Sequence, residues 1–173
     1  MELRSLIRDV PNFPKQGIIF KDITTLLKDP NGLNNAVEKL LNFLCNKQIT
    51  KVVAIESRGF ILGGIVAQKL GAGFVPIRKP GKLPAECISE NYSLEYGTDK
   101  IEIHKDAIQK GEKILLHDDL LATGGTMEAA CKLVERLGGE VVQISFLIEL
   151  SFLKGREKLK NYDVRSIIQY DSE

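Results

Sequence analysis

Short apolar runs alternate along this chain with longer segments whose apolar residues recur at helical spacing. An apolar run of four to eight residues between turn signals is typical of a buried strand, and recurrence every three or four residues is typical of a helix. The runs predicted to be strands cover residues 51–55, 73–77, 114–117, 141–148 and 164–168. The segments predicted to be helices cover residues 60–70, 126–137 and, as a shorter helix, 153–159.

One further helix is predicted before the first of these strands. Asn31 or Asn34 is placed to cap it, and it is expected to run to about Asn46. Its apolar residues fall on one face, as expected of a helix that packs on a core. They are Leu33, Val37, Leu40, Leu41 and Leu44.

Strands that alternate with helices predict an α/β fold with a mostly parallel central sheet flanked by helices. Ligands of such sheets bind beyond the carboxyl ends of the strands. Three of the predicted strand ends are followed by polar or glycine-rich sequence, at residues 56–59, 78–82 and 118–119. We therefore expect these three segments to converge on one site.

Residues 78–105 interrupt this alternation. They contain two prolines and a hairpin signal around Gly97, in which residues 92–96 would pair with residues 101–104. A long excursion of this kind is usually a functional flap or a disordered insert. We predict a mobile flap.

Composition narrows the class of protein. A chain of 173 residues with 43% hydrophobic and 27% charged residues predicts one globular domain over residues 1–173. A net charge of +1 argues against a nucleic-acid partner and against a basic membrane-surface protein. The sequence also lacks a signal-peptide pattern and any apolar run near the roughly 20 residues of a membrane span. The three cysteines, Cys45, Cys87 and Cys131, are far apart and are expected to be reduced thiols in the cytoplasm.

The most informative segment is Ile114–Thr126, in which an apolar strand leads to two carboxylates, a loop of small residues and the start of a helix. Glycines let the backbone approach a phosphate closely, and the N–H groups and dipole of a helix N-terminus attract it. Carboxylates beside that loop accept hydrogen bonds from sugar hydroxyls. The segment therefore predicts a sugar-phosphate site. It is neither a P-loop, since no lysine follows the glycines, nor a dinucleotide fingerprint.

This segment resembles the phosphoribosyl-pyrophosphate signature of the type I phosphoribosyltransferases, in the form found in members that act on adenine. Other segments agree with that family in the same order, over nearly the whole chain. They are residues 20–23, 56–60, 78–79 with 82–84, 93–97 and 153–159.

The resemblance implies a type I phosphoribosyltransferase fold, with a small N-terminal hood over about residues 1–32 that recognises the base and a mobile flap over about residues 78–105. It implies that adenine and phosphoribosyl pyrophosphate, with Mg²⁺, give AMP and pyrophosphate in purine salvage. The family position of Arg78 reaches the neighbouring subunit's site, which implies a homodimer.

The resemblance also implies roles for the phosphate and ribose contacts. Asp118 and Asp119 would accept hydrogen bonds from the ribose hydroxyls, or from waters on a Mg²⁺ that the substrate carries, with no direct protein ligand to the metal. Their charge would also favour a cationic ribose ring. The 5′-phosphate would be held by Ala122, Thr123, Gly124, Gly125 and Thr126. Pyrophosphate would be bound by Ser57, Arg58, Arg78, Lys79 and Lys82.

The adenine site implied by the resemblance comes from separate parts of the chain. Phe20, in an early loop, would pack on one face of the base and Leu120 on the other. Backbone groups of Ile19 and Lys21 would read the edge of the purine, and Arg58 would contact it. In the flap, Glu95 would be the catalytic carboxylate that handles the adenine N7 and N9 protons or offsets developing charge, with Tyr96 beside it.

Three further points concern His117, one peptide bond and the alternative functions. The family usually has an apolar residue where this chain has His117, which we expect to be partly buried and neutral, with a role in pH response as the alternative. The resemblance also implies a cis peptide bond between Glu56 and Ser57. The alternatives to adenine transfer are transfer to another purine such as xanthine, or a non-catalytic regulator that senses phosphoribosyl pyrophosphate.

Overall fold

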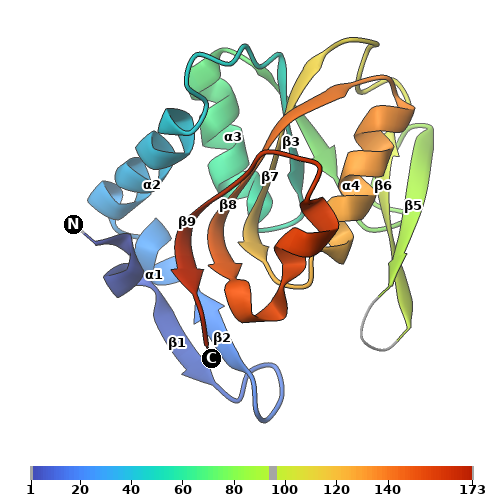
Figure 1. The fold of residues 1–173 in the computed structure, drawn as a ribbon. Helices are drawn as coiled ribbons and strands as arrows, with labels where there is room; N and C mark the ends of the chain where they lie inside the picture. The colour runs from blue at the N-terminus through green and yellow to red at the C-terminus, as the bar shows by residue number, and fades with distance from the viewer. Residues whose placement is uncertain (1, 94–96, 173) are drawn as a thin grey trace.

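A parallel sheet lies at the centre of the computed structural model, which describes residues 2–93 and 97–172 (Figure 1). Its strand order is β4-β3-β7-β8-β9, and hydrogen-bonded neighbours run parallel. The predicted α/β fold is confirmed. The strands are β3 (Lys51–Ile55), β4 (Gly73–Ile77), β7 (Lys113–Leu121), β8 (Glu140–Leu150) and β9 (Val164–Tyr170).

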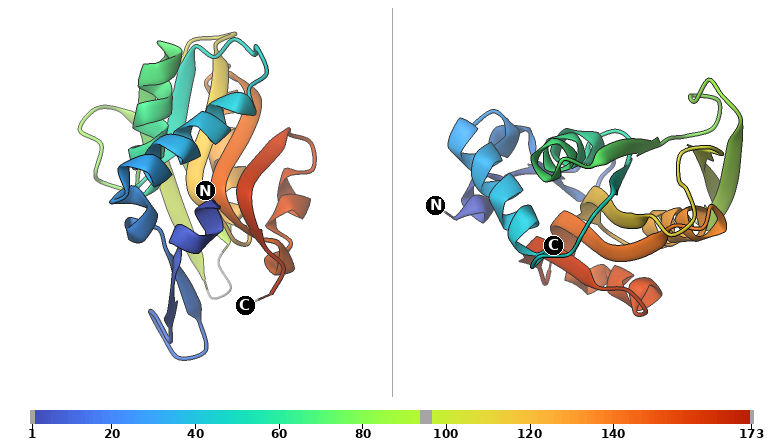
Figure 2. Two further views of the ribbon diagram at one scale, coloured as in Figure 1. Left: turned by 90° about the vertical axis from the view of Figure 1, so that its left-hand side faces the viewer. Right: turned by 90° about the horizontal axis from the view of Figure 1, so that it is seen from above.

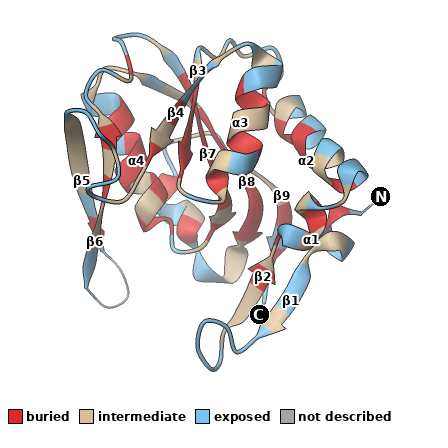
Figure 3. Ribbon diagram, turned by 180° about the vertical axis from the view of Figure 1, so that it is seen from behind, coloured by how far each residue is buried: buried red, intermediate tan, exposed pale blue. Residues whose placement is uncertain are grey.

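Helices cover both faces of the sheet (Figure 2). Helices α2 (Pro30–Asn42) and α3 (Gly59–Leu70) pack on one face, and α4 (Gly125–Arg136) packs on the other. Successive strand residues point to opposite faces, so Leu115 joins the core under α2 and α3 while Leu116 joins the core under α4. Buried positions accordingly run through the strands and the inner faces of the helices (Figure 3).

Helix α2 begins and ends earlier than the sequence predicted. Its cap is Asp29, whose Oδ2 accepts a hydrogen bond from the Gly32 backbone N–H at 3.0 Å, and not Asn31 or Asn34. Pro30 follows at the first helical position, where its fixed φ suits a helix. The helix ends at Asn42 rather than Asn46, because the backbone turns left-handed at Cys45 and Asn46.

The strand β7 extends past the acid pair that was predicted to follow it. Asp118 pairs with Phe146 and Leu120 with Ile148, so both carboxylates belong to the strand. The neighbouring strand β8 is long enough to offer ladder partners through Leu121. Pairing with β8 therefore overrides the local preference of adjacent charged residues for a loop.

The hairpin in residues 78–105 is longer than predicted and starts earlier. Strands β5 (Cys87–Ser93) and β6 (Thr98–His104) are antiparallel, and their pairing begins at Cys87 opposite His104. Ile101 and Ile103 are fully buried in the core under α4. Packing on α4 thus fixes a register that the local sequence did not reveal. Glu95 and Tyr96 lie outside the described residues.

The N-terminal segment forms η1 (Leu3–Leu6), strands β1 (Arg8–Pro11) and β2 (Ile19–Asp22), and the short helix α1 (Thr24–Leu27). The two strands form an antiparallel hairpin below the carboxyl ends of β7, β8 and β9 (Figure 1). Phe20, which was expected in a loop, lies in β2 opposite Val10. Ladder hydrogen bonds therefore hold it in place.

The short helix predicted over residues 153–159 is present only from Gly155 to Leu159, and it is a 3₁₀ helix. Two 3₁₀ turns, η2 (Ser151–Leu153) and η3 (Gly155–Leu159), form this segment because Lys154 between them has a left-handed φ of 54°. The predicted free thiols are confirmed for Cys45, Cys87 and Cys131. In the part of the chain that the structure describes, no helix combines the length and apolar character needed to cross a membrane.

Candidate functional site

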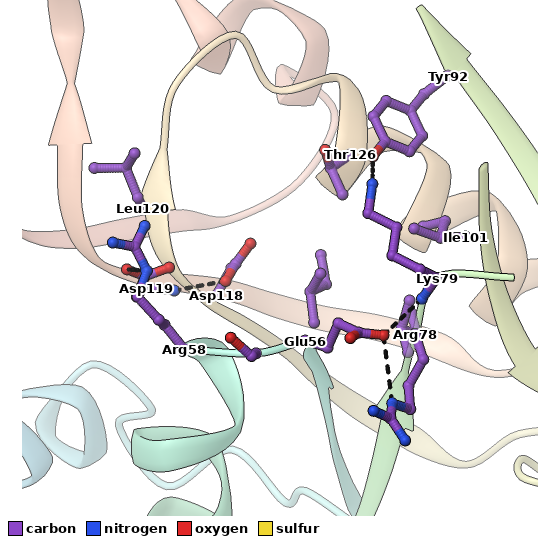
Figure 4. A pocket seen from close by; sticks show the side chains of 13 residues that line it. Glu56, Arg58, Arg78, Lys79, Tyr92, Ile101, Asp118, Asp119, Leu120 and Thr126 are labelled. Carbon is purple, nitrogen blue, oxygen red and sulfur yellow. Dashed lines mark hydrogen bonds and ion pairs between the residues drawn. The ribbon is translucent and has the colours of Figure 1, made fainter. Parts of the chain in front are cut away.

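A cavity of about 380 Å³ opens at the carboxyl ends of β3, β4 and β7. The structure brings the three predicted strand ends together around it. Arg58, Asp119 and Leu120 lie on one side of the cavity, and Arg78, Lys79 and Tyr92 on the other (Figure 4). The lining residues are Ile55, Glu56, Ser57, Arg58, Ile77, Arg78, Lys79, Tyr92, Ile101, Asp118, Asp119, Leu120 and Thr126.

A smaller cavity of about 80 Å³ adjoins the first and is formed by the loop that precedes α4. Gly124 has a φ of 81°, which glycine adopts without strain, and Gly125 is the first residue of α4. The loop thus places a helix N-terminus, with its free N–H groups, beside the main cavity. Both cavities are lined by Asp118, Leu120 and Thr126, and the smaller one also by Ala122, Thr123 and Gly124.

Of the two adjacent carboxylates, Asp119 is buried and Asp118 is half-buried. Asp118 Oδ1 accepts a hydrogen bond from the Asp119 backbone N–H at 2.8 Å, and Asp119 Oδ2 lies 2.8 Å from Arg58 Nε. Burial, and then the charge of Asp119, raises the pKa of Asp118 well above its usual value. Burial also raises the pKa of Asp119, although the Arg58 guanidinium opposes that shift. Such a pair favours a ligand that donates hydrogen bonds or develops positive charge.

Arg58 connects the acid pair to the N-terminal hairpin. Its guanidinium carbon lies 4.9 Å from the centroid of the Phe20 ring, within cation–π range. The Phe13 ring meets Phe20 edge-on, with 5.1 Å between centroids. Arg58 and Phe20, two residues predicted to contact a base, therefore touch each other at the edge of the cavity.

The side chain of Lys21 is engaged within the hairpin. Its ammonium lies 2.8 Å from Asp9 Oδ1 and 4.2 Å from the centroid of the Tyr170 ring. The prediction for Ile19 and Lys21 concerned their backbone groups, and it stays a prediction.

Glu56 belongs to a segment that was expected at the site, but the sequence reasoning gave it no role. Its Oε2 lies 3.3 Å from Arg78 Nε and accepts a hydrogen bond from the Lys79 backbone N–H at 2.7 Å, while Oε1 lies 2.6 Å from Lys82 Nζ. Burial alone would raise the pKa of Glu56, but these hydrogen bonds and charges hold it below its usual value. A charged Glu56 therefore ties the end of β3 to the segment after β4.

Lys79 makes a second connection, from that segment to the hairpin of β5 and β6. Its ammonium donates to the Tyr92 hydroxyl at 2.7 Å and forms an ion pair with Asp99, and Tyr92 in turn donates to Asp99 at 2.9 Å. Hence the side chains of Arg78, Lys79 and Lys82 are all paired with carboxylates of the chain itself. An incoming polyanion would compete with those carboxylates.

The missed residues differ in how far the sequence could have revealed them. Glu56 directly follows a buried apolar strand, and a charge at that position was a usable signal. Tyr92 and Asp99 face each other only through the register of the hairpin. No local pattern encodes that pairing.

His117 is fully buried, 1% exposed, and not partly buried as predicted. It precedes the acid pair on β7, where its Nδ1 lies 3.0 Å from Ser145 Oγ. Burial lowers the pKa of His117 to about 4, so the predicted neutral imidazole is confirmed. The peptide bond between Glu56 and Ser57 is cis, as the resemblance implied.

Comparison with known proteins agrees with this geometry. Residues 22–172 match the model of the phosphoribosyl transferase domain. The adenine phosphoribosyltransferase of Christiangramia forsetii is 59% identical over 170 residues, which cover 98% of this chain and 99% of the relative.

Solved structures are similar over the same length. The adenine phosphoribosyltransferase of Thermoanaerobacter pseudethanolicus superposes with a TM-score of 0.95 at 54% identity, covering 98% of both chains. The enzyme of Saccharomyces cerevisiae, solved in complex with an imino-altritol bisphosphate and adenine, gives a TM-score of 0.90 at 41% identity, covering 95% of this chain and 96% of that one.

Proposed function

The chain belongs to the phosphoribosyl transferase domain family, and we propose that it transfers the 5-phosphoribosyl group of phosphoribosyl pyrophosphate to adenine, giving AMP and pyrophosphate. The observation that carries this proposal is the meeting of three kinds of group around two adjoining cavities. The acid pair and the cationic segment of residues 78–82 border the larger cavity, and the phosphate loop of residues 122–126 borders the smaller one. Phe20 lies against Arg58 at the edge of the larger cavity. A reaction that breaks a ribosyl–oxygen bond to pyrophosphate needs each of these groups.

The ribose phosphate would be anchored first. Residues 122–126 hold the 5′-phosphate through backbone N–H groups at the start of α4 and the hydroxyls of Thr123 and Thr126. Asp118 and Asp119 accept hydrogen bonds from the ribose 2′- and 3′-hydroxyls. As the bond to pyrophosphate breaks, the ring gains positive charge, which the two carboxylates stabilise.

Mg²⁺ fits this donor set. The carboxylate oxygens of Asp118 and Asp119 at the cavity are hard ligands, and Mg²⁺ typically binds one or two carboxylates, substrate phosphates and waters. We infer that it arrives with phosphoribosyl pyrophosphate and is held by the acid pair through water. When bound, it neutralises charge on the leaving pyrophosphate.

Pyrophosphate would be received by Ser57, Arg58, Arg78, Lys79 and Lys82. Glu56 and Asp99 keep the last three cations paired before the substrate arrives. Because phosphate oxygens accept charge-assisted hydrogen bonds as carboxylates do, the leaving group replaces one acceptor by another. Arg78, Lys79 and Lys82 therefore need not lose an anionic partner without gaining another.

Adenine would lie between Phe20 and Leu120, with Arg58 and the backbone of Ile19 and Lys21 at its edge. Glu95 would handle its N7 and N9 protons, with Tyr96 beside it. Glu95 and Tyr96 lie outside the described residues, so their roles rest on the resemblance alone.

Replacing Phe20 by alanine is expected to raise the KM for adenine about tenfold, since stacking on an aromatic ring contributes about 1–3 kcal/mol per base. The KM for phosphoribosyl pyrophosphate should stay within twofold. Steady-state kinetics with each substrate varied in turn measures both. Phe43→Ala, at a half-buried ring that follows α2 and does not line the cavity, is the matched control. An unchanged KM for adenine in Phe20→Ala would remove Phe20 from the base site.

The function itself is tested by offering the purified protein adenine, hypoxanthine, guanine, xanthine and orotate with phosphoribosyl pyrophosphate and Mg²⁺. Adenine should react at least about tenfold faster than any other base, and pyrophosphate should appear in equal amount to AMP. Preference for xanthine would reassign the base. Absence of turnover, with ligand-dependent DNA binding, would favour a regulator.

We further propose that the enzyme is a homodimer of single-domain subunits, each with a hood over about residues 1–32 and a mobile flap over about residues 78–105. The outer face of α3 supports the dimer: Ile61 is 43% exposed, and nearby Phe74 is 38% exposed. Residues 59–67 of α3 include no polar side chain, which is unusual for a helix that faces water. Sedimentation equilibrium measures the mass directly. The free cysteines suit a reducing compartment, the cytoplasm.

A further inference from the structure

The 3₁₀ turn η3 (Gly155–Leu159) packs directly against the phosphate loop. A Cβ atom on Gly124 would lie 2.4 Å from the carbonyl oxygen of Gly155, and one on Gly155 would lie 2.2 Å from the carbonyl oxygen of Ala122. The two backbones are therefore in contact without intervening side chains. Figure 1 shows this segment beside the lower end of α4. None of the roles assigned above uses it.

The position of η3 is fixed by an ion pair between the half-exposed Arg156 and the buried Glu149. Arg156 donates to both oxygens of Glu149, at 2.9 and 2.5 Å, and to the carbonyl oxygen of Val164 at 2.7 Å. Glu149 is 5% exposed and also accepts a hydrogen bond from Ser166 at 2.5 Å. Leu159 at the other end of the turn is fully buried. Contacts of Arg156 with β8 and β9, and burial of Leu159 in the core under α4, thus hold the two ends of the segment.

This anchoring delivers the ammonium group of Lys158 to the start of α4. Lys158 Nζ lies 3.7 Å from the point where a Cβ on Gly125 would be. The ammonium thus lies within van der Waals distance of the first residue of α4. Within residues 2–93 and 97–172, the ammonium has neither a hydrogen bond nor an ion pair, whereas Arg78, Lys79 and Lys82 are all paired.

We propose that Lys158 is a further binding residue of the 5′-phosphate site, and that η3 forms the outer wall of that site. The proposal rests on the proposed function, which places a phosphate dianion on residues 122–126. An ammonium on a flexible stem acts as a compact point charge, and a phosphate at a helix N-terminus accepts a charge-assisted hydrogen bond from it. Lys158 thereby adds a full charge to a loop whose other donors are neutral N–H and hydroxyl groups.

The test compares Lys158→Met with Lys160→Met, which removes an exposed lysine two positions further along. Lys158→Met should raise the KM for phosphoribosyl pyrophosphate about tenfold and leave kcat and the KM for adenine within twofold. Lys160→Met should leave all three within twofold. Lys158→Arg should restore most of the lost affinity, since it restores the charge. Isothermal titration with ribose 5-phosphate should show the same tenfold loss for Lys158→Met without any turnover.

An unchanged KM and an unchanged affinity for ribose 5-phosphate in Lys158→Met would overturn the proposal. An equal loss in Lys160→Met would also overturn it, because it would show a general effect of surface charge. A wild-type protein that binds ribose 5-phosphate but does not convert adenine would refute the proposed function alone. The titration would still decide the role of Lys158. Thermal unfolding of each variant confirms that the comparison is made on folded protein.

Discussion

Replacing Asp118 by asparagine is expected to lower kcat at least about 100-fold, the usual loss when a preorganised electrostatic group is removed from a reacting centre. Asparagine keeps the oxygen that accepts the hydrogen bond from the Asp119 backbone N–H, so the loop geometry should survive. What disappears is the negative charge that faces the ribose ring. The KM for adenine should change little, because Asp118 would not contact the base.

The same substitution should raise the free energy of unfolding at pH 7. The pKa of Asp118 is raised in the folded state, by burial and by Asp119, so the folded protein binds that proton more tightly than the unfolded chain does. Stability is therefore lost as pH rises from the usual aspartate range through the raised value. A neutral asparagine removes that loss. Activity and stability are thus expected to move in opposite directions.

Steady-state kinetics and denaturant unfolding at pH 7 check both parts. Asp106→Asn, at an exposed carboxylate, is the matched control for loss of charge. Asp119→Asn should also lose activity, and without a gain in stability, because it separates Arg58 from its partner. The double substitution should abolish measurable turnover. A kcat for Asp118→Asn within threefold of the wild-type value would contradict the assigned role.

His117 is expected to make the folded state pH-sensitive between about pH 6.5 and pH 4. Its pKa falls from 6.5 to about 4 because burial disfavours the imidazolium. Below pH 6.5 the unfolded chain takes up a proton that the folded protein refuses, so the free energy of unfolding falls with pH until the folded state also protonates near pH 4. One pKa unit corresponds to about 1.4 kcal/mol, so the full loss is about 3 kcal/mol.

The measurement is denaturant unfolding at half-unit pH steps from 8 to 4. His117→Val should lack this loss, because valine does not titrate. Ser145→Ala should retain it, because the imidazole stays buried after the hydrogen bond to Ser145 Oγ is removed. The raised pKa of Asp118 acts in the opposite direction, so the comparison uses the difference between wild type and variant. A parallel pH profile for wild type and His117→Val would show that burial does not control this histidine.

Periodicity predicted much of the sheet and its helices. The bounds of β3 and β4 match the predicted strands, and Gly71 ends α3 in the left-handed conformation that favours glycine. The strand bounds predicted from periodicity were wrong where a neighbouring strand or helix supplies the pairing partner or the packing surface. Strand β7 runs through its acids because β8 continues beside it, and β5 begins at Cys87 because α4 covers the hairpin.

In the candidate site too, residues close together in sequence were predicted, and pairings between distant residues were missed. The order of motifs pointed to the phosphate loop and to the acid pair, because a helix N-terminus after a strand is a local arrangement. Glu56, Tyr92 and Asp99 were missed as partners of the cationic segment, since each pairing joins residues 13 to 26 positions apart. Lys158 reaches the loop only because Arg156 and Glu149 hold its segment there.

The sequence by itself therefore determined the fold class and predicted a phosphate loop beside an acid pair, because periodicity and local motifs act over a few residues. The tertiary structure decided the state of the charged groups. Burial on β7 keeps His117 neutral and raises the pKa of Asp118, while close carboxylates hold Arg78, Lys79 and Lys82. The physical reason is that desolvation and Coulomb interactions depend on distances through space, which a linear pattern does not contain.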